Sequence, residues 1–172
     1  MRTLIDQPEV EYLDGHPYPK MSPKATHAFV QGAFIRVLHS LGGALGKTLP
    51  ELRCHIGAVD DTKTEFVPDV AFILNERWYA LPADRREEPP FAPDIAVEIR
   101  SPGEKARYRE HKIARYLATG AQLVLDVDPR SRAIYVYDDQ GMRVCRTHDR
   151  FEDARLSWLA FDVARVFEDL EP

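Results

Sequence analysis

The sequence predicts an α/β fold in which a mixed central β-sheet is flanked by helices, and three observations predict it. A strand-like segment, a helical segment and a second strand-like segment follow one another between residues 94 and 127. Turn sequences then lead into two more strand-like segments, 133–137 and 142–147. A helical segment precedes them, after Ser22-Pro23. Because a crossover helix joins parallel strands and short turns join antiparallel ones, we expect strands of both directions in one sheet.

Three helices are expected, over residues 23–42, 104–119 and 162–170. For the first helix, Ser22 is typical of an N-cap and Pro23 of the first helical position, and Gly42-Gly43 marks the end. Gly120 is typical of the residue that follows the last turn of a helix, so it ends the second one. The third helix is expected to close the domain.

The strand-like segments differ in the environment that they predict. Residues 52–59 and 65–74 flank the turn sequence 60–63, so they are expected to form a hairpin. Residues 94–99 place Ile95, Val97 and Ile99 on one face and acidic residues on the other, which predicts two different environments. Residues 82–93 hold four of the thirteen prolines and predict a solvated loop that covers or borders the functional site.

Length and composition favour one domain over residues 1–172, because 44% hydrophobic content is sufficient for a single substantial core. Cys54 and Cys145 are far apart in the sequence and belong to no paired cysteine motif, which favours a reducing compartment. The first residues lack the apolar stretch of a signal peptide, and no apolar run approaches the ~20 residues that cross a bilayer. We therefore expect a cytoplasmic protein that does not associate with membranes.

The net charge of −5 argues against strong nonspecific attraction to nucleic acid, because clustered Lys and Arg drive phosphate binding. A metal site, however, needs acidic residues of its own, and a local basic surface can exist on an acidic protein. Candidates for such a surface cluster on the second helix and just before it: Lys105, Arg107, Arg109, Lys112 and Arg115.

Asp69 and Glu98 are the residues that point to chemistry. Each lies within an apolar strand-like segment, and an ionised carboxylate there costs several kcal/mol unless it has a partner. A hard cation is one partner that holds two carboxylates, and Mg²⁺ is usually bound by one or two of them together with waters and phosphate oxygens. The pair therefore predicts a magnesium or manganese site that acts on phosphodiester bonds.

Several segments, in this order and spacing, resemble the Uma-type family of bacterial restriction endonucleases: Pro68–Ala71, Pro93–Ile99 followed by Ser101-Pro102, Lys112 with Tyr116 and Gly120, and Asp126–Pro129. The resemblance extends over most of the chain, from Met21–Pro23 with His27 to the closing helix. This family lies within the PD-(D/E)XK nuclease superfamily. The resemblance implies a restriction-endonuclease-like fold, with Asp69, Glu98 and the backbone carbonyl of Ile99 as metal ligands.

The sequence departs from the superfamily pattern two residues after Glu98, where Arg100 stands in place of lysine. The resemblance implies that the lysine has moved to the following helix, as Lys112, and Tyr108, Lys112 and Tyr116 share one helical stripe. Lys112 is then expected to orient the attacking water and to stabilise developing negative charge. Arg100 is the alternative for this role, as a phosphate clamp that stays protonated.

Each of these residues also has a structural interpretation. Asp69 after proline is compatible with shaping an edge strand. Glu98 is compatible with an internal ion pair to Arg100 or Lys112, and Lys112 alone is typical of a solvated helix residue. For Asp69 and Glu98 the metal-site interpretation is favoured, whereas the catalytic role of Lys112 depends on these two acids.

Other polar residues give weaker signals. His27 and Gln31, one helical turn apart, are expected to line the site together with Arg100 and Tyr116, although His27 is equally compatible with a bond to nearby backbone. Asp126 and Asp128 resemble acids that the family has at a strand end, but Asp128 before proline is also typical of a turn, which we favour. The remaining histidines lack metal-ligand spacing, so no zinc site is expected.

The sequence thus favours a magnesium- or manganese-dependent endonuclease that hydrolyses DNA. Two alternatives remain: a catalytically inactive protein that keeps the nuclease fold as a nucleic-acid-binding or scaffold module, and a nuclease that acts on RNA. A homodimer is also expected by analogy with nucleases of this fold, with the strands near residues 134–144 as the interface.

Overall fold

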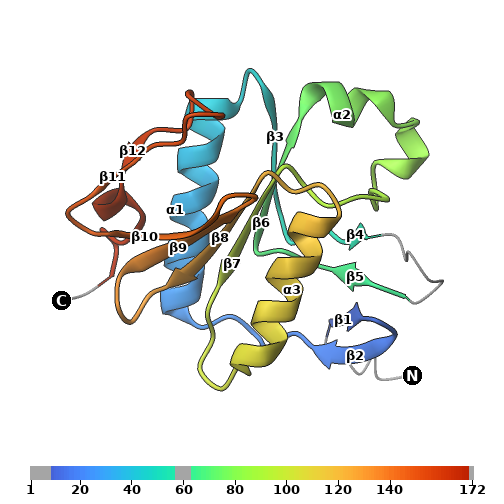
Figure 1. The fold of residues 1–172 in the computed structure, drawn as a ribbon, viewed down its shortest axis with the longest axis horizontal. Helices are drawn as coiled ribbons and strands as arrows, with labels where there is room; N and C mark the ends of the chain where they lie inside the picture. The colour runs from blue at the N-terminus through green and yellow to red at the C-terminus, as the bar shows by residue number, and fades with distance from the viewer. Residues whose placement is uncertain (1–8, 57–62, 171–172) are drawn as a thin grey trace, which may run out of the picture.

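The fold, seen in a computed structural model that describes residues 9–56 and 63–170, is built on a six-stranded sheet (Figure 1). Its strands are β3 (Gly46–Pro50), β6 (Val70–Leu74), β7 (Ile95–Ile99), β8 (Leu123–Asp128), β9 (Ala133–Asp138) and β10 (Gly141–Arg146). They lie in the order β10-β9-β8-β7-β6-β3. β7 and β8 are parallel, whereas the other neighbours are antiparallel. The mixed sheet and its parallel pair were both predicted.

Helices α1 (Ala25–Gly42) and α3 (Ala106–Ala118) cover opposite faces of this sheet (Figure 1). Phe34 and Leu38 of α1 join a buried cluster that includes Val97. Ile113 and Tyr116 of α3 join a second cluster. Successive strand side chains point to opposite faces, so the alternation within β7 sends its apolar residues toward α1 and Glu98 toward α3. This confirms the two environments predicted for residues 94–99.

A second sheet lies beside α3, in the strand order β2-β1-β5-β4 (Figure 1). It consists of β1 (Val10–Leu13), β2 (His16–Pro19), β4 (Cys54–His55) and β5 (Glu65–Phe66). Buried Leu13 and Phe66 join the α3 cluster. The pairing of β4 with β5 confirms one part of the predicted hairpin, whose turn lies outside the described residues, while residues 70–74 belong to the large sheet instead.

The predicted start of the first helix is wrong by two residues. The helix begins at Ala25, and Lys24 is its N-cap with no side-chain capping bond. Ser22 and Pro23 precede the helix and line a surface hollow next to the site. The end of the helix at Gly42 is as predicted.

The predicted helix over 162–170 is also wrong. The chain forms β11 (Arg150–Phe151) paired with β12 (Phe161–Asp162), and then a short 3₁₀ helix, Val163–Val166. Phe161 and Val163 are both buried although they are two residues apart, a spacing that suits extended chain and not an α-helix. Burial against the core therefore overrides the helical pattern.

Residues 82–93 form the expected loop, with no regular element other than a short 3₁₀ helix, Ala83–Arg85, but not at the expected place. The helix α2 (Asn75–Ala80) precedes this loop, and β7 follows it. This segment follows the C-terminal end of β6 and precedes the N-terminal end of β7, whereas Asp69 and Glu98 are at the other ends of those strands. It lies far from them and does not border the site (Figure 1).

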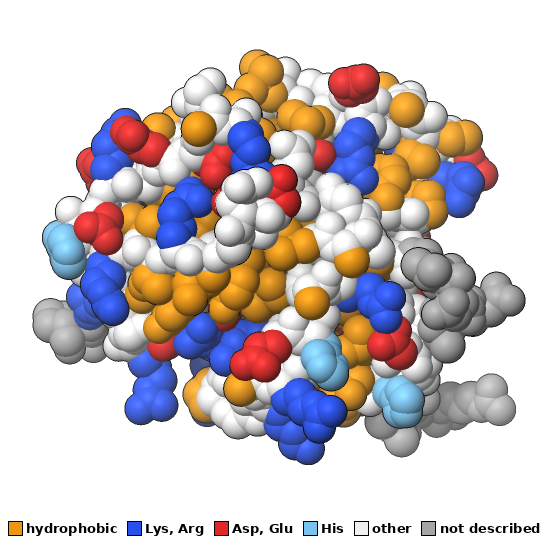
Figure 2. Space-filling model, viewed as in Figure 1, with side chains coloured by type: hydrophobic (Ala, Val, Ile, Leu, Met, Phe, Trp, Pro, Cys, Tyr) orange, Lys and Arg blue, Asp and Glu red, His pale blue; other side chains and the backbone are white. Residues whose placement is uncertain are grey.

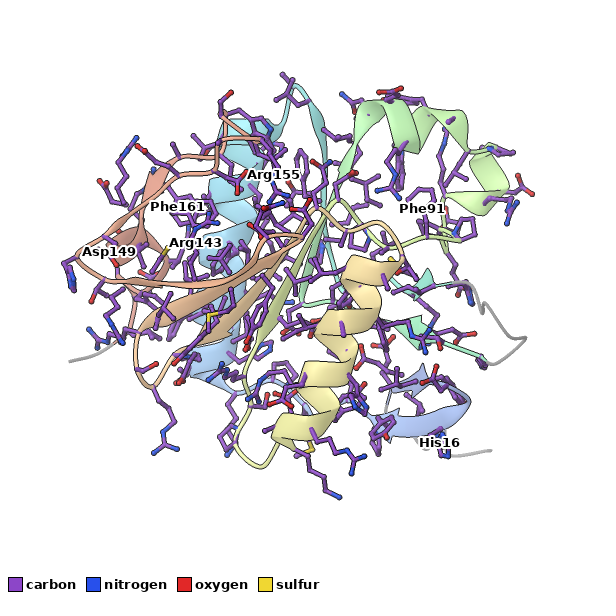
Figure 3. All side chains as sticks on the ribbon, viewed as in Figure 1. His16, Phe91, Arg143, Asp149, Arg155 and Phe161 are labelled. Atoms are coloured by element: carbon purple, nitrogen blue, oxygen red, sulfur yellow. The ribbon has the colours of Figure 1, made fainter. Side chains whose placement is uncertain are left out.

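The C-terminal segment is fastened to the sheet edge by ion pairs and aromatic contacts. Arg155 lies 3.1 Å from a carboxylate oxygen of Asp138, and Arg143 lies 3.4 Å from the same carboxylate. Phe161 stacks on Phe151 with ring centroids 4.9 Å apart. Arg143, Arg155 and Phe161 lie in one part of the molecule, around β9 to β12 (Figure 3). In the part of the chain that the structure describes, no helix has the length and apolar character to span a membrane.

Candidate active site

The strand register brings Asp69 and Glu98 together. β6 and β7 are antiparallel with Val70 opposite Val97, so one further step places Asp69 opposite Glu98. The backbone N–H of Ile99 donates to Asp69 Oδ2 at 2.6 Å, which holds this carboxylate against the end of β7. Both side chains are buried, with 2% and 9% of their residues' surface exposed. The two acids lie at the end of the sheet, between α1 and α3.

Asp69 is surrounded by cationic and polar groups. His27 Nε2 lies 3.2 Å from Oδ2 and Lys20 Nζ lies 3.1 Å from Oδ1, while the Gln31 amide donates to the backbone carbonyl at 2.9 Å. Burial raises the pKa of Asp69, but the hydrogen bond from His27 and the charge of Lys20 outweigh it, and the pKa falls to about 2. Asp69 is therefore ionised at neutral pH. Gln31 thus borders the site, as does His27.

Glu98 has a different environment. Lys112 Nζ lies 2.8 Å from Oε1, and the Tyr116 hydroxyl donates to the same oxygen at 2.8 Å. Burial raises the pKa of Glu98; Lys112 lowers it, but the charges of Glu11 and Asp69 raise it further, and the net result is about 8. At neutral pH the Glu98 carboxyl group therefore holds a proton, and only a further positive charge beside it favours the ionised form.

Lys112 is a buried cation and not the solvated helix residue of the structural interpretation, since its side chain is 4% exposed. Its ammonium contacts Glu98 and also both carboxylate oxygens of Glu11, at 2.7 and 2.9 Å. Burial lowers the pKa of Lys112, but these two carboxylates raise it well above its usual value, so the group stays protonated. The predicted stripe on α3 is confirmed, because the Tyr108 hydroxyl donates to Glu11 as well, at 2.9 Å.

Arg100 does not join this cluster. Its guanidinium makes two hydrogen bonds to Asp126, at 2.9 and 2.6 Å, and lies 4.2 Å from the centre of the Tyr135 ring. Glu98 therefore pairs with Lys112 and not with Arg100, whereas the role of Arg100 as a phosphate clamp stays a prediction. Asp128 accepts hydrogen bonds from the backbone of Arg130 and from the Ser131 hydroxyl, which confirms its role in the turn.

Sequence analysis missed three residues of the site, Glu11, Lys20 and Glu51. Glu11 is 4% exposed and accepts a hydrogen bond from the backbone of Val67, in addition to those from α3. Lys20 contacts Glu51 and donates to the carbonyl of Val67 at 2.6 Å. Glu11 stands among the apolar residues of β1, and that alternation was a usable signal; Lys20 and Glu51 give no sequence signal that we can identify.

The donors at the site suit a hard divalent cation. Among residues 9–56 and 63–170, no group of three His, Cys, Asp or Glu side chains forms a complete ligand set. A site for Mg²⁺ needs fewer protein ligands, because this ion keeps several waters and substrate oxygens. Asp69 Oδ1 is buried and has the Lys20 ammonium 3.1 Å away, but it accepts no hydrogen bond from a described residue, so it is the oxygen that could hold such an ion beside Glu98.

The mixed sheet with helices on both faces and two acids on adjacent strands defines a restriction-endonuclease-like fold. The chain belongs to the Uma2 family, described as "Putative restriction endonuclease", whose model matches residues 2–161. A crystal structure described as a putative nuclease belonging to DUF820, from Anabaena variabilis, is similar with a TM-score of 0.82. It is 23% identical, over 94% of this chain and 90% of that chain. No curated protein matches.

Proposed function

We propose that this protein is a divalent-metal-dependent endonuclease that hydrolyses phosphodiester bonds of DNA. The observation that carries the proposal is the position of Asp69 opposite Glu98 across β6 and β7, with more negative charge than the nearby cations compensate. The two carboxylates are the side-chain ligands for Mg²⁺ or Mn²⁺. A nuclease family makes nucleic acid the substrate class, and DNA is the substrate that restriction endonucleases cut.

The backbone of Ile99 supplies the third protein ligand. In a β-strand the N–H and C=O groups of one residue project toward the same neighbouring strand. Because the N–H of Ile99 points at Asp69, its carbonyl also faces the Asp69 side. A bound divalent cation at this place polarises the scissile phosphate and lowers the pKa of a coordinated water.

The remaining residues of the site hold charges in position. Lys112, as a permanent cation, holds the Glu98 carboxylate at 2.8 Å and offsets negative charge that develops at the phosphate. Tyr116 fixes the same carboxylate oxygen. Lys20 is the more accessible ammonium, with 16% of its side chain exposed against 4% for Lys112, and it places a second positive charge beside Asp69. Of the two, Lys20 is the one positioned to meet substrate.

Plasmid cleavage with Mg²⁺ or Mn²⁺ tests the function. We expect the wild type to nick or cut plasmid DNA, and Asp69→Ala and Glu98→Ala to lose at least about a hundredfold in rate, the scale seen when a key electrostatic group is removed from an active site. Asp84→Ala, which removes an exposed aspartate at the other end of the sheet, is the matched control and should keep full activity. Circular dichroism verifies that the variants are folded. Equal nicking by Asp69→Ala and wild type would contradict the assignment.

The two alternative functions, an inactive scaffold and an RNA nuclease, can each be tested separately. Metal calorimetry separates the enzyme from an inactive scaffold, because a scaffold has no reason to bind Mg²⁺ through Asp69 and Glu98. Parallel digestion of single-stranded RNA and DNA of the same sequence separates an RNA nuclease from a DNA nuclease.

A homodimer is also proposed, through the strands β9 and β10. Met142 is 53% exposed there and lies opposite Tyr137, so the two side chains share the sheet face next to α3. Figure 2 shows hydrophobic side chains gathered over the middle of this face of the molecule. Light scattering after size-exclusion chromatography should give twice the mass of one chain for the wild type. The Met142→Lys variant should give the mass of a single chain. A single-chain mass for the wild type at high concentration would rule the dimer out.

A further inference from the structure

A second surface hollow adjoins the candidate active site. The first hollow, of about 350 Å³, is lined by Lys20 and Gln31 of the site. The second, of about 480 Å³, lies between the start of α1, the loop after β7 and the turn between β8 and β9. Both are lined by Met21, Ser22 and His27. Because His27 also contacts Asp69, the second hollow opens beside the proposed metal site.

The lining of the second hollow is positively charged. Four cationic side chains, Lys24, Arg100, Arg109 and Arg130, face two carboxylates there, Glu104 and Asp128. Burial raises the pKa of Glu104, which weakens its negative charge further. The hollow therefore has an excess of positive charge on a protein whose total charge is −5.

The four cations are of two kinds. Arg100 and Arg109 are held in place by the buried carboxylate of Asp126, at 2.6 and 3.3 Å. Lys24 and Arg130 are exposed, and neither side chain has an ion-pair or hydrogen-bond partner among the residues that the structure describes. The hollow therefore combines two fixed guanidinium groups, of Arg100 and Arg109, with two unpaired cations, Lys24 and Arg130. This combination is suited to a ligand that carries a full negative charge.

The backbone around the hollow is also well defined. The turn that carries Arg130 is held by the bond from its N–H to Asp128, at 2.9 Å. Gly103, on the opposite rim, has a φ of +89°, a conformation that other residues rarely adopt. The rim therefore presents Arg130 from a constrained turn, which lowers the entropy cost of binding a ligand.

We propose that this second hollow binds a phosphate of the DNA strand next to the phosphate that is cut. The inference rests on the proposed nuclease function, since it assigns the substrate's position relative to that site. The strand runs from Lys20 and Asp69, past His27, to Lys24 and Arg130. These two residues position the substrate and take no part in bond cleavage.

The test is a binding measurement that needs no cleavage. Fluorescence anisotropy of a short labelled DNA duplex with Ca²⁺ in place of Mg²⁺ compares wild type with the double variant Lys24→Gln/Arg130→Gln. We expect at least about tenfold weaker binding, and a slope of log affinity against log salt that is shallower by about one, because one phosphate contact is lost. Arg85→Gln is the matched control, because it removes an exposed arginine at the other end of the sheet, and it should change neither quantity.

A series of duplexes that each carry one neutral methylphosphonate linkage locates the contact. Wild type should bind one of these duplexes about tenfold more weakly than the unmodified DNA, and the double variant should be insensitive to that same linkage. Equal sensitivity in both proteins, or unchanged affinity of the double variant, would overturn the proposal. The wild type could also bind one methylphosphonate duplex more weakly and yet cut no nucleic acid. That result would support the phosphate site and contradict only the proposed nuclease function.

Discussion

Asp69 and Glu98 face each other, yet their surroundings shift their pKa values in opposite directions. Asp69 has both Lys20, which it shares with Glu51, and His27 beside it, so it is ionised. Glu98 shares the single ammonium of Lys112 with Glu11, and its pKa of about 8 follows from burial and from this shared cation. A divalent cation supplies the missing positive charge. The apo site is therefore expected to hold one proton more at neutral pH than the metal-bound site does.

This difference gives a prediction on pH dependence. Mg²⁺ binds the ionised form of Glu98, so below pH 8 binding must release a proton, and the apparent affinity should rise with pH and level off above about 8. Calorimetry at pH 7 in two buffers of different ionisation enthalpy measures the number of protons released, which we expect to approach one. The Glu98→Gln variant should release none. Metal binding by the wild type without proton release would show that Glu98 is already ionised in the apo protein.

The sequence predicted these two acids because each interrupts an apolar strand and because their spacing resembles that of a nuclease family. It did not predict Glu11, which lies 101 residues from Lys112 in the chain and meets it only through the tertiary fold. Arg100 shows the same limit: its position two residues after Glu98 made it an alternative to Lys112, but Asp126 on the next strand takes its guanidinium. A partner from a distant strand has no local signature.

At the scale of elements, the β1 strand is part of the site and not an N-terminal appendage. It brings Glu11 beneath α3, and the segment after β2 brings Lys20 to Asp69. The buried Glu11 also anchors the backbone of Val67, just ahead of Asp69. The small sheet therefore couples the position of α3 to the position of the proposed metal ligands.

The ion pair between Glu11 and Lys112 should make a measurable contribution to folding. Lys112→Met leaves two buried carboxylates without their cation, and we expect it to lower the free energy of unfolding by about 3 to 5 kcal/mol. In a Glu11→Gln background only one carboxylate is left unpaired, so the same substitution should cost about 1 to 3 kcal/mol less. Urea unfolding of the four proteins measures this coupling.

Lys105→Met is the control for that cycle, because it removes an exposed lysine at the N-cap of the same helix. It should change the free energy of unfolding by less than about 0.5 kcal/mol. Strictly additive effects of Glu11→Gln and Lys112→Met would show that the two side chains do not interact in the folded protein.

Elements with a local signature were predicted well from the sequence. The succession of β7, α3 and β8 was predicted because the spacing of apolar residues changes along the chain. Apolar residues alternate in the first strand, follow a helical period in the next segment, which ends at Gly120, and return to a strand-like run after it. The errors arose where tertiary packing decides. Phe161 lies in β12 and Val163 begins a 3₁₀ helix because each fills the core beside α1, and no residue in 162–170 predicts this from the sequence. The pairing of β7 with β8 was predicted from the helix between them, whereas the position of β3 at the edge of the sheet has no such local pattern.

At the scale of the whole molecule, the net charge of −5 and the proposed DNA substrate appear to conflict, and the distribution of charge resolves the conflict. Figure 2 shows basic and acidic side chains mixed over the visible face, without one continuous basic surface. Of the basic residues expected to form a local surface, Lys112 is buried and Arg109 is paired with Asp126 and Glu104, whereas the hollow beside the site keeps Lys24 and Arg130 unpaired. We therefore expect attraction to the proposed DNA substrate to be short in range and confined to the site.

This distribution predicts a weak dependence of DNA binding on salt. Affinity falls with salt in proportion to the number of phosphates contacted, with a slope of log affinity against log salt of about −0.9 for each. The proposed contacts are to the phosphate that is cut and to the one in the hollow, so one copy of the chain should give a slope of about −2. Anisotropy with Ca²⁺ over a range of KCl concentrations measures it. A slope steeper than about −6 would mean that further basic residues, outside the hollow or on a second copy of the chain, contact the DNA.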